Sequence, residues 1–321
     1  MDVIVSYFKE LWTAVKRVDC RLMFNFYETT LEFMQNRFRV VAPREGASGI
    51  VRRDVHEALH ISLGATICAD GTAMKPVVCL PVDNLRSIPA VLRSRFWWCG
   101  SAASRGWMNG QMFRQWLLAD FLPQVKEKWY RLHFSPLTPI SDGESEKDRG
   151  MRPLLIFDGL CSHTCWDTQR LLKQGGVRSL VLPPHTSHVT QPLDNGVFLA
   201  FKRECRKAQG PIMSAVGRRA KMHAMLVAAA DAVDVATDRK TIALAWRTTG
   251  IFPWNPQRVF RSPFVRGDIP TETAEWLKWT WEEPNPGTVR SIYLVDQIIS
   301  PAEVEQRLIP LGEDEEEEVC E

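Results

Sequence analysis

Two aspartates follow apolar segments that have the length of buried strands. Asp158 comes directly after residues 153–157, and Asp194 follows the next apolar segment, 178–182. The carboxyl ends of neighbouring parallel strands open into one crevice, so we expect the two carboxylates to lie close together. Carboxylate oxygens bind hard cations such as Mg²⁺ or Mn²⁺, and paired ions ~3.5–4 Å apart support phosphodiester cleavage. An aspartate at a strand end also caps turns and helices, so the pattern alone leaves both roles open.

The segment between the two aspartates predicts a strand–helix–strand unit. A helix is predicted to begin at Thr164, with Asp167 as its capping-box partner, and to end at Gly175 and Gly176. A crossover of this kind joins parallel strands and is right-handed.

The periodicity of the remaining chain predicts further elements around this unit. Apolar residues recur at helical spacing over 1–18 and 110–132, and further strands are predicted at 22–26, 38–41, 59–69 and 74–80. Asp70-Gly71 is a hairpin-turn signal between the last two strands, so Asp70 is interpreted as a turn residue. The Pro-rich and charged residues 135–149 predict an exposed loop. Together these elements predict an α/β fold with a mixed sheet and packed helices.

Composition narrows the class of protein. The chain has 321 residues, of which 45% are hydrophobic and 24% charged, as in soluble globular proteins of one or two domains. No stretch approaches the ~18 apolar residues of a membrane span, so no membrane partner is expected. The early acid in the N-terminal sequence argues against a signal peptide.

The cysteines do not follow a zinc-site spacing. No CxxC pair occurs among the eight, and a chain of this size does not need a disulfide framework. Cys161, His163 and Cys165 form a short cluster without the distant second pair of ligands of a structural zinc site. We therefore expect reduced thiols in an intracellular compartment.

Charge is distributed unevenly along the chain. The net charge is +2, but residues 313–321 hold seven acids and no base; without them, 40 Lys and Arg face 31 acids, a net charge of +9. A basic body with an acidic tail is typical of nucleic-acid binders, and a solvated terminus explains the tail equally well. The expected organisation is an N-terminal helix that is a remnant or linker (1–19), one domain (20–262), a Trp- and Pro-rich extension (263–312) and the acidic tail (313–321).

A basic segment follows Asp194. A helix that carries these side chains would bind backbone phosphates near the carboxylates, whereas an isolated basic run is as often a solvated helix face. His185 and His188 precede Asp194 and either contact phosphate or serve turn and packing roles, while His163 is interpreted as structural. The candidate DNA-binding residues are His185, His188, Lys202, Arg203, Arg206 and Lys207.

Two long motifs connect these observations to a known family. Residues 157–163 read FDGLCSH and residues 182–194 read LPPHTSHVTQPLD. The two motifs are in register, and their aspartates are 36 positions apart. Together they resemble the DDE superfamily endonuclease domain of the pogo/Tigger and centromere-protein-B-like transposases (mariner superfamily). Residues 69–72, 106–108 and 245–256 are similar to further elements of that domain, so the resemblance covers roughly residues 20–260. It implies an RNase H-like fold with a mixed five-stranded sheet flanked by helices.

The resemblance also implies a function and a site. It implies DNA as partner, Mg²⁺ or Mn²⁺ as cofactor, a nuclear location, a homo-oligomer, and Asp158 and Asp194 as catalytic, metal-binding residues. Relatives normally carry helix-turn-helix domains before the nuclease, and about twenty residues precede the first strand here.

One position departs from the family pattern. The family's first acid lies on the first strand, and Tyr27 stands at that position, in Asn25-Phe26-Tyr27-Glu28. A phenol is a poor ligand for a hard cation because it stays protonated near neutral pH. Glu28 is the candidate substitute acid, but alternation along a strand directs it to the opposite face unless the strand bulges. We therefore expect an impaired nuclease; the alternative is a non-catalytic domain that binds nucleic acid or protein.

Overall fold

The computed structural model describes residues 2–31, 61–101, 106–265 and 275–276. The strand predicted at 38–41, the acidic tail and nearly all of the C-terminal extension lie outside these residues.

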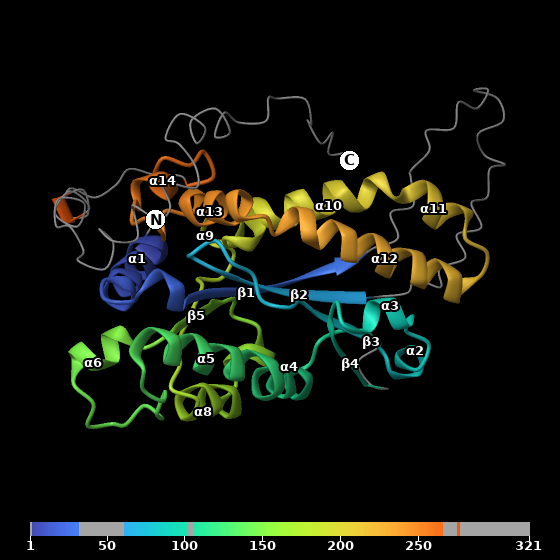
Figure 1. Ribbon diagram of the computed structural model, residues 1–321. Coiled ribbons are helices and arrows are strands. Elements are labelled where there is room, and N and C mark those ends of the chain that lie inside the picture. Colours follow the sequence, from blue (N-terminus) through green and yellow to red (C-terminus); the bar gives the residue numbers. More distant parts are fainter. Residues whose placement is uncertain (1, 32–60, 102–105, 266–274, 277–321) are drawn as a thin grey trace.

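The described residues form one sheet with helices on both faces (Figure 1). The strands are β1 (Met23–Leu31), β2 (Ile61–Cys68), β3 (Val77–Pro81), β4 (Trp97–Ser101), β5 (Leu154–Phe157) and β6 (Arg178–Val181). The α-helices up to β6 are α1 (Asp2–Val15), α2 (Val82–Leu85), α3 (Ala90–Arg93), α4 (Gly110–Trp116), α5 (Leu122–His133), α6 (Glu146–Met151), α7 (Cys161–Thr164) and α8 (Trp166–Gln174). After β6 come α9 (Ser187–Thr190), α10 (Phe198–Lys207), α11 (Gln209–Ser214), α12 (Arg218–Ala236), α13 (Arg239–Thr248) and α14 (Gln257–Phe260). A 3₁₀ turn, η1 (Cys20–Leu22), precedes β1, and two π-helical segments, η3 (Leu117–Phe121) and η4 (Leu193–Val197), precede α5 and α10.

The sheet has the strand order β4-β3-β2-β1-β5-β6. β1 pairs with β2 in antiparallel register, Tyr27 opposite Ala65, and with β5 in parallel register, Asn25 opposite Ile156. β5 and β6 are also parallel, as the predicted crossover requires. This topology places the end of β5 beside the middle of β1, so Asp158 emerges next to Tyr27 and Glu28.

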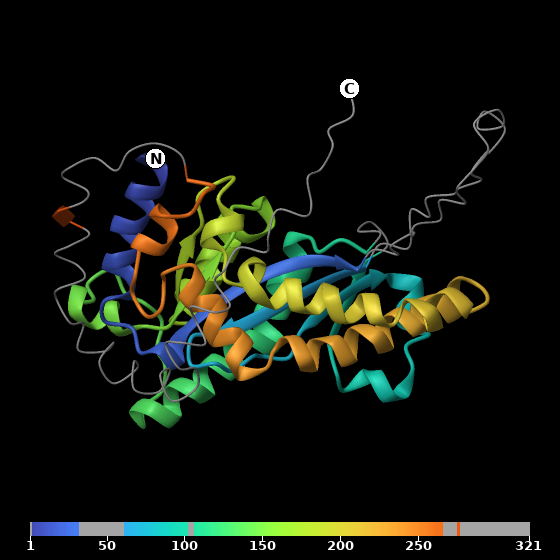
Figure 2. The same cartoon turned by 90° about the horizontal axis from the view of Figure 1, so that it is seen from above.

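Two hydrophobic layers enclose the sheet. In β1, Phe24 and Phe26 pack under the sheet with α4, η3 and α5, whereas Met23 and Tyr27 contact the other layer. That other layer contains residues of α1, η4, α10, α12, α13 and α14, and Figure 2 shows α10 and α12 lying side by side across the sheet. This alternation is the period of two expected of a strand buried on both faces.

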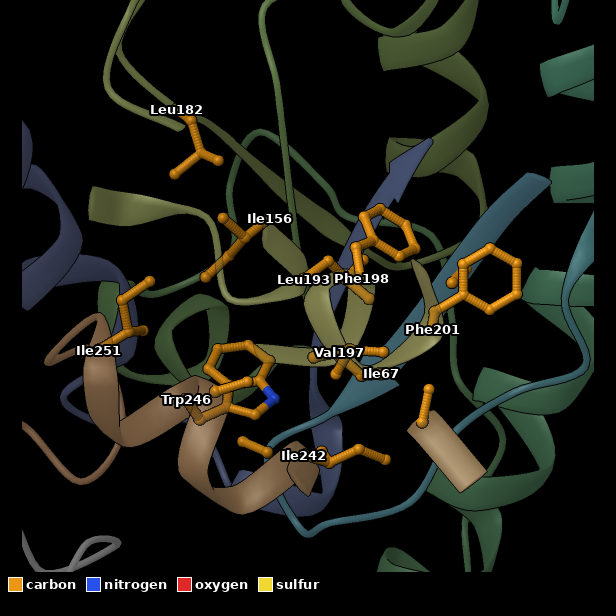
Figure 3. Packing of buried hydrophobic residues seen from close by; sticks show 14 of the residues in the cluster. Ile67, Ile156, Leu182, Leu193, Val197, Phe198, Phe201, Ile242, Trp246 and Ile251 are labelled. Carbon is orange, nitrogen blue, oxygen red and sulfur yellow. The ribbon is translucent and has the colours of Figure 1, made fainter. Parts of the chain in front are cut away.

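The segment that carries Asp194 is anchored in the upper layer. Figure 3 shows Leu193, Val197 and Phe198 packed with Ile67 of β2, near Trp246 and Ile242 of α13. All of these side chains are at most 2% exposed. The close packing fixes η4, and with it the backbone on which Asp194 is carried.

The hairpin between β2 and β3 forms as predicted. Asp70 accepts hydrogen bonds from the backbone N–H and hydroxyl of Thr72, and Gly71 adopts φ +85°. A side chain at Gly71 would also meet Cγ of Arg239 at 2.6 Å. Asp70 therefore has the turn role that the sequence predicted, reinforced by an ion pair with Lys128 at 2.7 Å.

The predicted fold class, α/β with a mixed sheet flanked by helices, is confirmed, and the described residues form six strands where five were predicted. The added strand, β4, pairs in parallel with β3 at the sheet edge. Two local predictions were wrong. Residues 146–151 form α6, which Ser145 caps, rather than ending the predicted loop. Thr164 ends α7 and donates to Leu160 O, so α8 begins at Trp166 without a capping box.

The N-terminal helix contributes to the same core. Tyr7, Phe8, Leu11 and Val15 are buried, and the ring of Phe8 lies 5.7 Å from that of Trp254, between centroids. Large aromatic contacts of this kind hold α1 against the segment that precedes α14.

Candidate active site

Asp158 and Asp194 converge near the middle of β1. Asp158 directly follows β5, and Asp194 lies in the first turn of η4. Burial raises the pKa of Asp194 to about 6; the charge of Lys202 opposes this shift, and that of Asp158 adds to it. The two carboxylates are therefore close enough to interact electrostatically, as their positions after neighbouring strands predicted.

A buried asparagine holds the two backbone segments that carry these acids. Nδ2 of Asn25 donates to the carbonyl of Ile156 at 3.0 Å, and its Oδ1 accepts from the N–H of Leu193 at 3.2 Å. Asn25 is fully buried, so both bonds are shielded from water. Its position within an apolar strand is the signal by which sequence reasoning could have identified it as a positioning residue.

Tyr27 shares this environment. Its ring packs at 6.0 Å from that of Phe198, between centroids. Burial raises the pKa of Tyr27 above its usual value of 10; the charges of Asp194 and Asp158 act in the same direction, and a side-chain hydrogen bond with Ser187 opposes them. The phenol is therefore neutral at physiological pH.

A buried histidine bridges Asp158 and Glu28. Nδ1 of His163 lies 2.5 Å from Oδ1 of Asp158, and Nε2 lies 3.1 Å from Oε1 of Glu28. Burial alone would lower the pKa of His163, but the hydrogen bonds to the two carboxylates raise it to about 9. The imidazole is thus cationic at neutral pH and donates to both acids. Sequence reasoning assigned His163 a structural role and did not identify this bridge.

Glu28 approaches Asp158 from the face of β1 opposite to Tyr27. His163, to which Glu28 is bonded, packs against Phe26 and Phe113 in the lower layer, whereas Tyr27 packs against Phe198 in the upper layer. Glu28 is therefore linked to Asp158 through the imidazole ring.

The predicted DNA-binding residues are dispersed around this centre. His185 is exposed and has a positive φ of 60°, while His188 contacts the ring of Phe264 at 5.3 Å. On α10, Arg203 and Lys207 form ion pairs with Glu204, at 3.3 and 2.7 Å. The other two candidates on α10, Lys202 and Arg206, are exposed. Among these six candidate residues, Lys202 acts on Asp194, because its positive charge lowers the pKa of that carboxyl.

The donor set does not fit a pair of divalent ions. Hard cations take oxygen ligands, chiefly ionised carboxylates, and here Asp158 and Asp194 offer them while His163 occupies one oxygen of Asp158. Within the described ranges, no group of three or more His, Cys, Asp or Glu side chains is arranged to hold a metal ion.

A curated relative matches 192 residues of the chain at 29% identity. It is the MFS-type transporter clz9 of Cochliobolus lunatus; the match covers 59% of this chain and 18% of that protein. The chain therefore spans less than a fifth of that relative. Within its described part, the chain has no helix with the length and apolar character needed to cross a bilayer.

Two solved structures align with most of the chain at low similarity. A pre-cleavage Mos1 transpososome aligns over 74% of this chain and 61% of its own, with a TM-score of 0.38 and 11% identity. A Mos1 transposase paired-end complex with the left transposon end aligns over 76% of this chain and 59% of its own, with a TM-score of 0.35 and 11% identity.

A family model matches residues 60–248, which is more than half of the 321 residues and includes Asp158 and Asp194. The match begins after β1, so the assignment of Tyr27 to the first-acid position rests on the motif pattern around it. The model describes the DDE superfamily endonuclease, a group that generally uses divalent metals. This chain belongs to the family of DDE superfamily endonucleases.

Proposed function

We propose that this chain is a DNA-binding domain of transposase descent whose strand-cleaving site is impaired. The observation that carries the proposal is Tyr27, whose neutral phenol lies beside Asp194 and Asp158 where the family pattern has its first acid. A third carboxylate at this position would add a negative charge and oxygen ligands for a cation. The phenol adds no charge and is a poor ligand for a hard cation, because its pKa is raised above 10 and it stays protonated.

The two remaining acids cannot make up this deficit. Burial raises the pKa of Asp194 to about 6, and the charge of Lys202 offsets this shift only in part. Asp158 and Glu28 are both hydrogen-bonded to the His163 imidazolium, whose positive charge offsets part of their negative charge. A protein cation therefore neutralises part of the acidic cluster that a metal pair would require.

Support for DNA as the partner comes from family membership and from the charge of α10. An endonuclease fold acts on a nucleic-acid chain, and α10 presents Lys202 and Arg206 to solvent next to η4, which carries Asp194. Exposed cations beside such a site bind backbone phosphate without reading the base sequence. The proposal implies a nuclear location, which imaging of the tagged chain would test.

The decisive experiment is restoration of cleavage by one substitution. Wild type, Tyr27→Asp and Tyr27→Phe are incubated with supercoiled plasmid and either Mg²⁺ or Mn²⁺. We expect background nicking by wild type and by Tyr27→Phe, and metal-dependent nicking by Tyr27→Asp. Tyr27→Asp combined with Asp194→Asn is the matched control, because it regains the first acid while losing another, and it is expected to be inactive.

Two outcomes contradict the proposal. Metal-dependent nicking by wild type that Asp158→Ala abolishes would show that the native site is active. Failure of a folded, DNA-binding Tyr27→Asp variant to nick would show that the tyrosine is not what disables the site.

A further inference from the structure

Two tryptophans differ from the others in the described part of the chain because they are largely exposed. Trp166 is 70% exposed and Trp107 is 58% exposed, whereas the other described tryptophans are buried or half-buried. Indole rings bury large apolar areas in folded proteins. A largely exposed ring near a candidate active site, such as that of Trp166, is therefore placed to contact a ligand.

Both tryptophans belong to backbone segments near the turn and short helix that follow Asp158. Trp166 begins α8, directly after the short helix α7 from which His163 reaches Asp158. The N-terminus of α4 packs on α7: a Cβ at Gly110 would lie 3.7 Å from Cα of Ser162. Trp107 lies three residues before Gly110, and Figure 1 shows α4 and α8 together beneath the sheet.

Cationic groups accompany the exposed ring of Trp166. The guanidinium carbon of Arg170 lies 5.1 Å from its centroid, one helical turn further along α8. Nη1 of Arg114 donates to Sγ of Cys165, the residue before Trp166, at 3.4 Å. The Arg170 guanidinium lies over one face of this ring, so a base would stack on the other face while the cations attract its phosphate.

We propose that Trp166, with Arg170 and Arg114, forms a stacking site for an unpaired nucleobase beside Asp158. The inference rests on the proposed DNA-binding function and narrows its substrate to DNA with single-stranded or unstacked nucleotides. A base inside a duplex is already stacked on both faces, so an indole in solvent is open chiefly to bases that have left the helix.

Binding of labelled single-stranded DNA and of a duplex with the same sequence tests the site. Affinities of wild type, Trp166→Ala and Trp166→Phe are measured by fluorescence anisotropy across a series of salt concentrations. Trp166→Ala is expected to lose about tenfold in affinity for the single strand. The duplex affinity and the salt dependence should stay the same, because no cation has been removed. Trp166→Phe should keep most of the affinity, since a phenyl ring also stacks.

A base analogue provides a second readout. Wild type should quench the emission of 2-aminopurine placed within the single strand, and Trp166→Ala should not. Phe134→Ala is the matched control, because Phe134 is an 83% exposed aromatic at the C-terminal end of α5. Circular dichroism melting checks that each variant is folded.

The outcomes separate this inference from the function on which it rests. If wild type binds both DNA forms and Trp166→Ala matches it in affinity and quenching, the stacking site is refuted while DNA binding stands. If wild type binds neither form, the proposed function fails and the stacking site fails with it. Equal losses on the duplex and the single strand would show that Trp166 supports DNA binding without stacking an unpaired base, which also overturns the inference.

Discussion

Nδ1 of His163 lies 2.5 Å from Oδ1 of Asp158, inside a layer of aromatic rings. The same imidazole reaches Glu28 through Nε2, so one buried cation serves two carboxylates. The side chains of Asp158 and Glu28 are only 15% and 14% exposed. A single protein cation thus holds two partly buried carboxylates together and offsets the charge of both.

Removal of the imidazole should be strongly destabilising. His163→Gln leaves two partly buried carboxylates without their cation, and breaking such a network costs about 3 kcal/mol of the free energy of unfolding. Urea denaturation of the wild type and the variant measures the loss. Combining His163→Gln with Glu28→Gln should cost less than the two single losses added together, because each residue is the partner of the other. Additive losses would show that the bridge contributes nothing.

The exposed cations of α10 should control how DNA binding responds to salt. Lys202→Gln and Arg206→Gln should each weaken binding to all sequences alike and reduce the slope of log affinity against log salt by about one. Arg203→Gln and Lys207→Gln are the matched variants, and they should reduce the slope less because Glu204 already pairs with both side chains. Affinity that does not respond to salt would contradict a phosphate-binding role for α10.

The positions of Asp158 and Asp194 followed from local sequence signals. Each acid follows an apolar segment, and a right-handed crossover leaves few arrangements for two such segments. The signal for the hairpin was equally local, because the Asp70-Gly71 pair itself indicates a turn. In the structure, Gly71 adopts the positive φ that such a turn requires. These features depend on residues that are near one another in the chain.

The His163 bridge and the anchoring role of Asn25 could not be predicted in this way. Glu28 and His163 are 135 positions apart, and Asn25 and Leu193 are 168 positions apart. Each contact depends on strand register and on the packing of α7 or η4. β4 was missed for a related reason: five residues, including Gly100 and two tryptophans, carry little period-two signal, and pairing with β3 makes them a strand.

The ion pair between Asp70 and Lys128 should make part of the stability depend on pH. Burial acts to raise the pKa of Asp70, but Lys128 and Thr72 hold it below its ordinary value, and the pKa of Lys128 is raised. Because the pKa of Asp70 is lower in the folded than in the unfolded chain, Asp70 stabilises the fold at pH values above about 4, its pKa in the unfolded chain. This contribution is lost as the pH falls through the folded pKa. The raised pKa of Lys128 keeps its own contribution until pH rises above about 10.

Comparison of the wild type with Asp70→Asn at several pH values tests this coupling. The difference in the free energy of unfolding should be largest near neutral pH and should shrink towards pH 3, where Asp70 becomes protonated in the unfolded chain. Lys128→Gln should show the same trend, since it removes the other charge of the pair. A difference that stays constant from pH 7 to pH 3 would assign the effect of Asp70 to its turn hydrogen bonds instead.

Gly250 should tolerate no side chain, because two independent constraints meet there. Its φ is +66°, a left-handed conformation that costs other residues about 1–2 kcal/mol. A Cβ at this position would also overlap the carbonyl of Asn255. The N–H of Asn255 donates to the carbonyl oxygen of Gly250 at 2.8 Å, so the two backbones are held close together. Gly250→Ala should therefore reduce the free energy of unfolding by at least about 2 kcal/mol. Gly210→Ala is the matched control, since no atom lies within 4 Å of a Cβ there and alanine favours the helix α11. Equal stability of the two variants would mean that the turn after α13 adjusts to a side chain and does not hold Trp254 rigidly against α1.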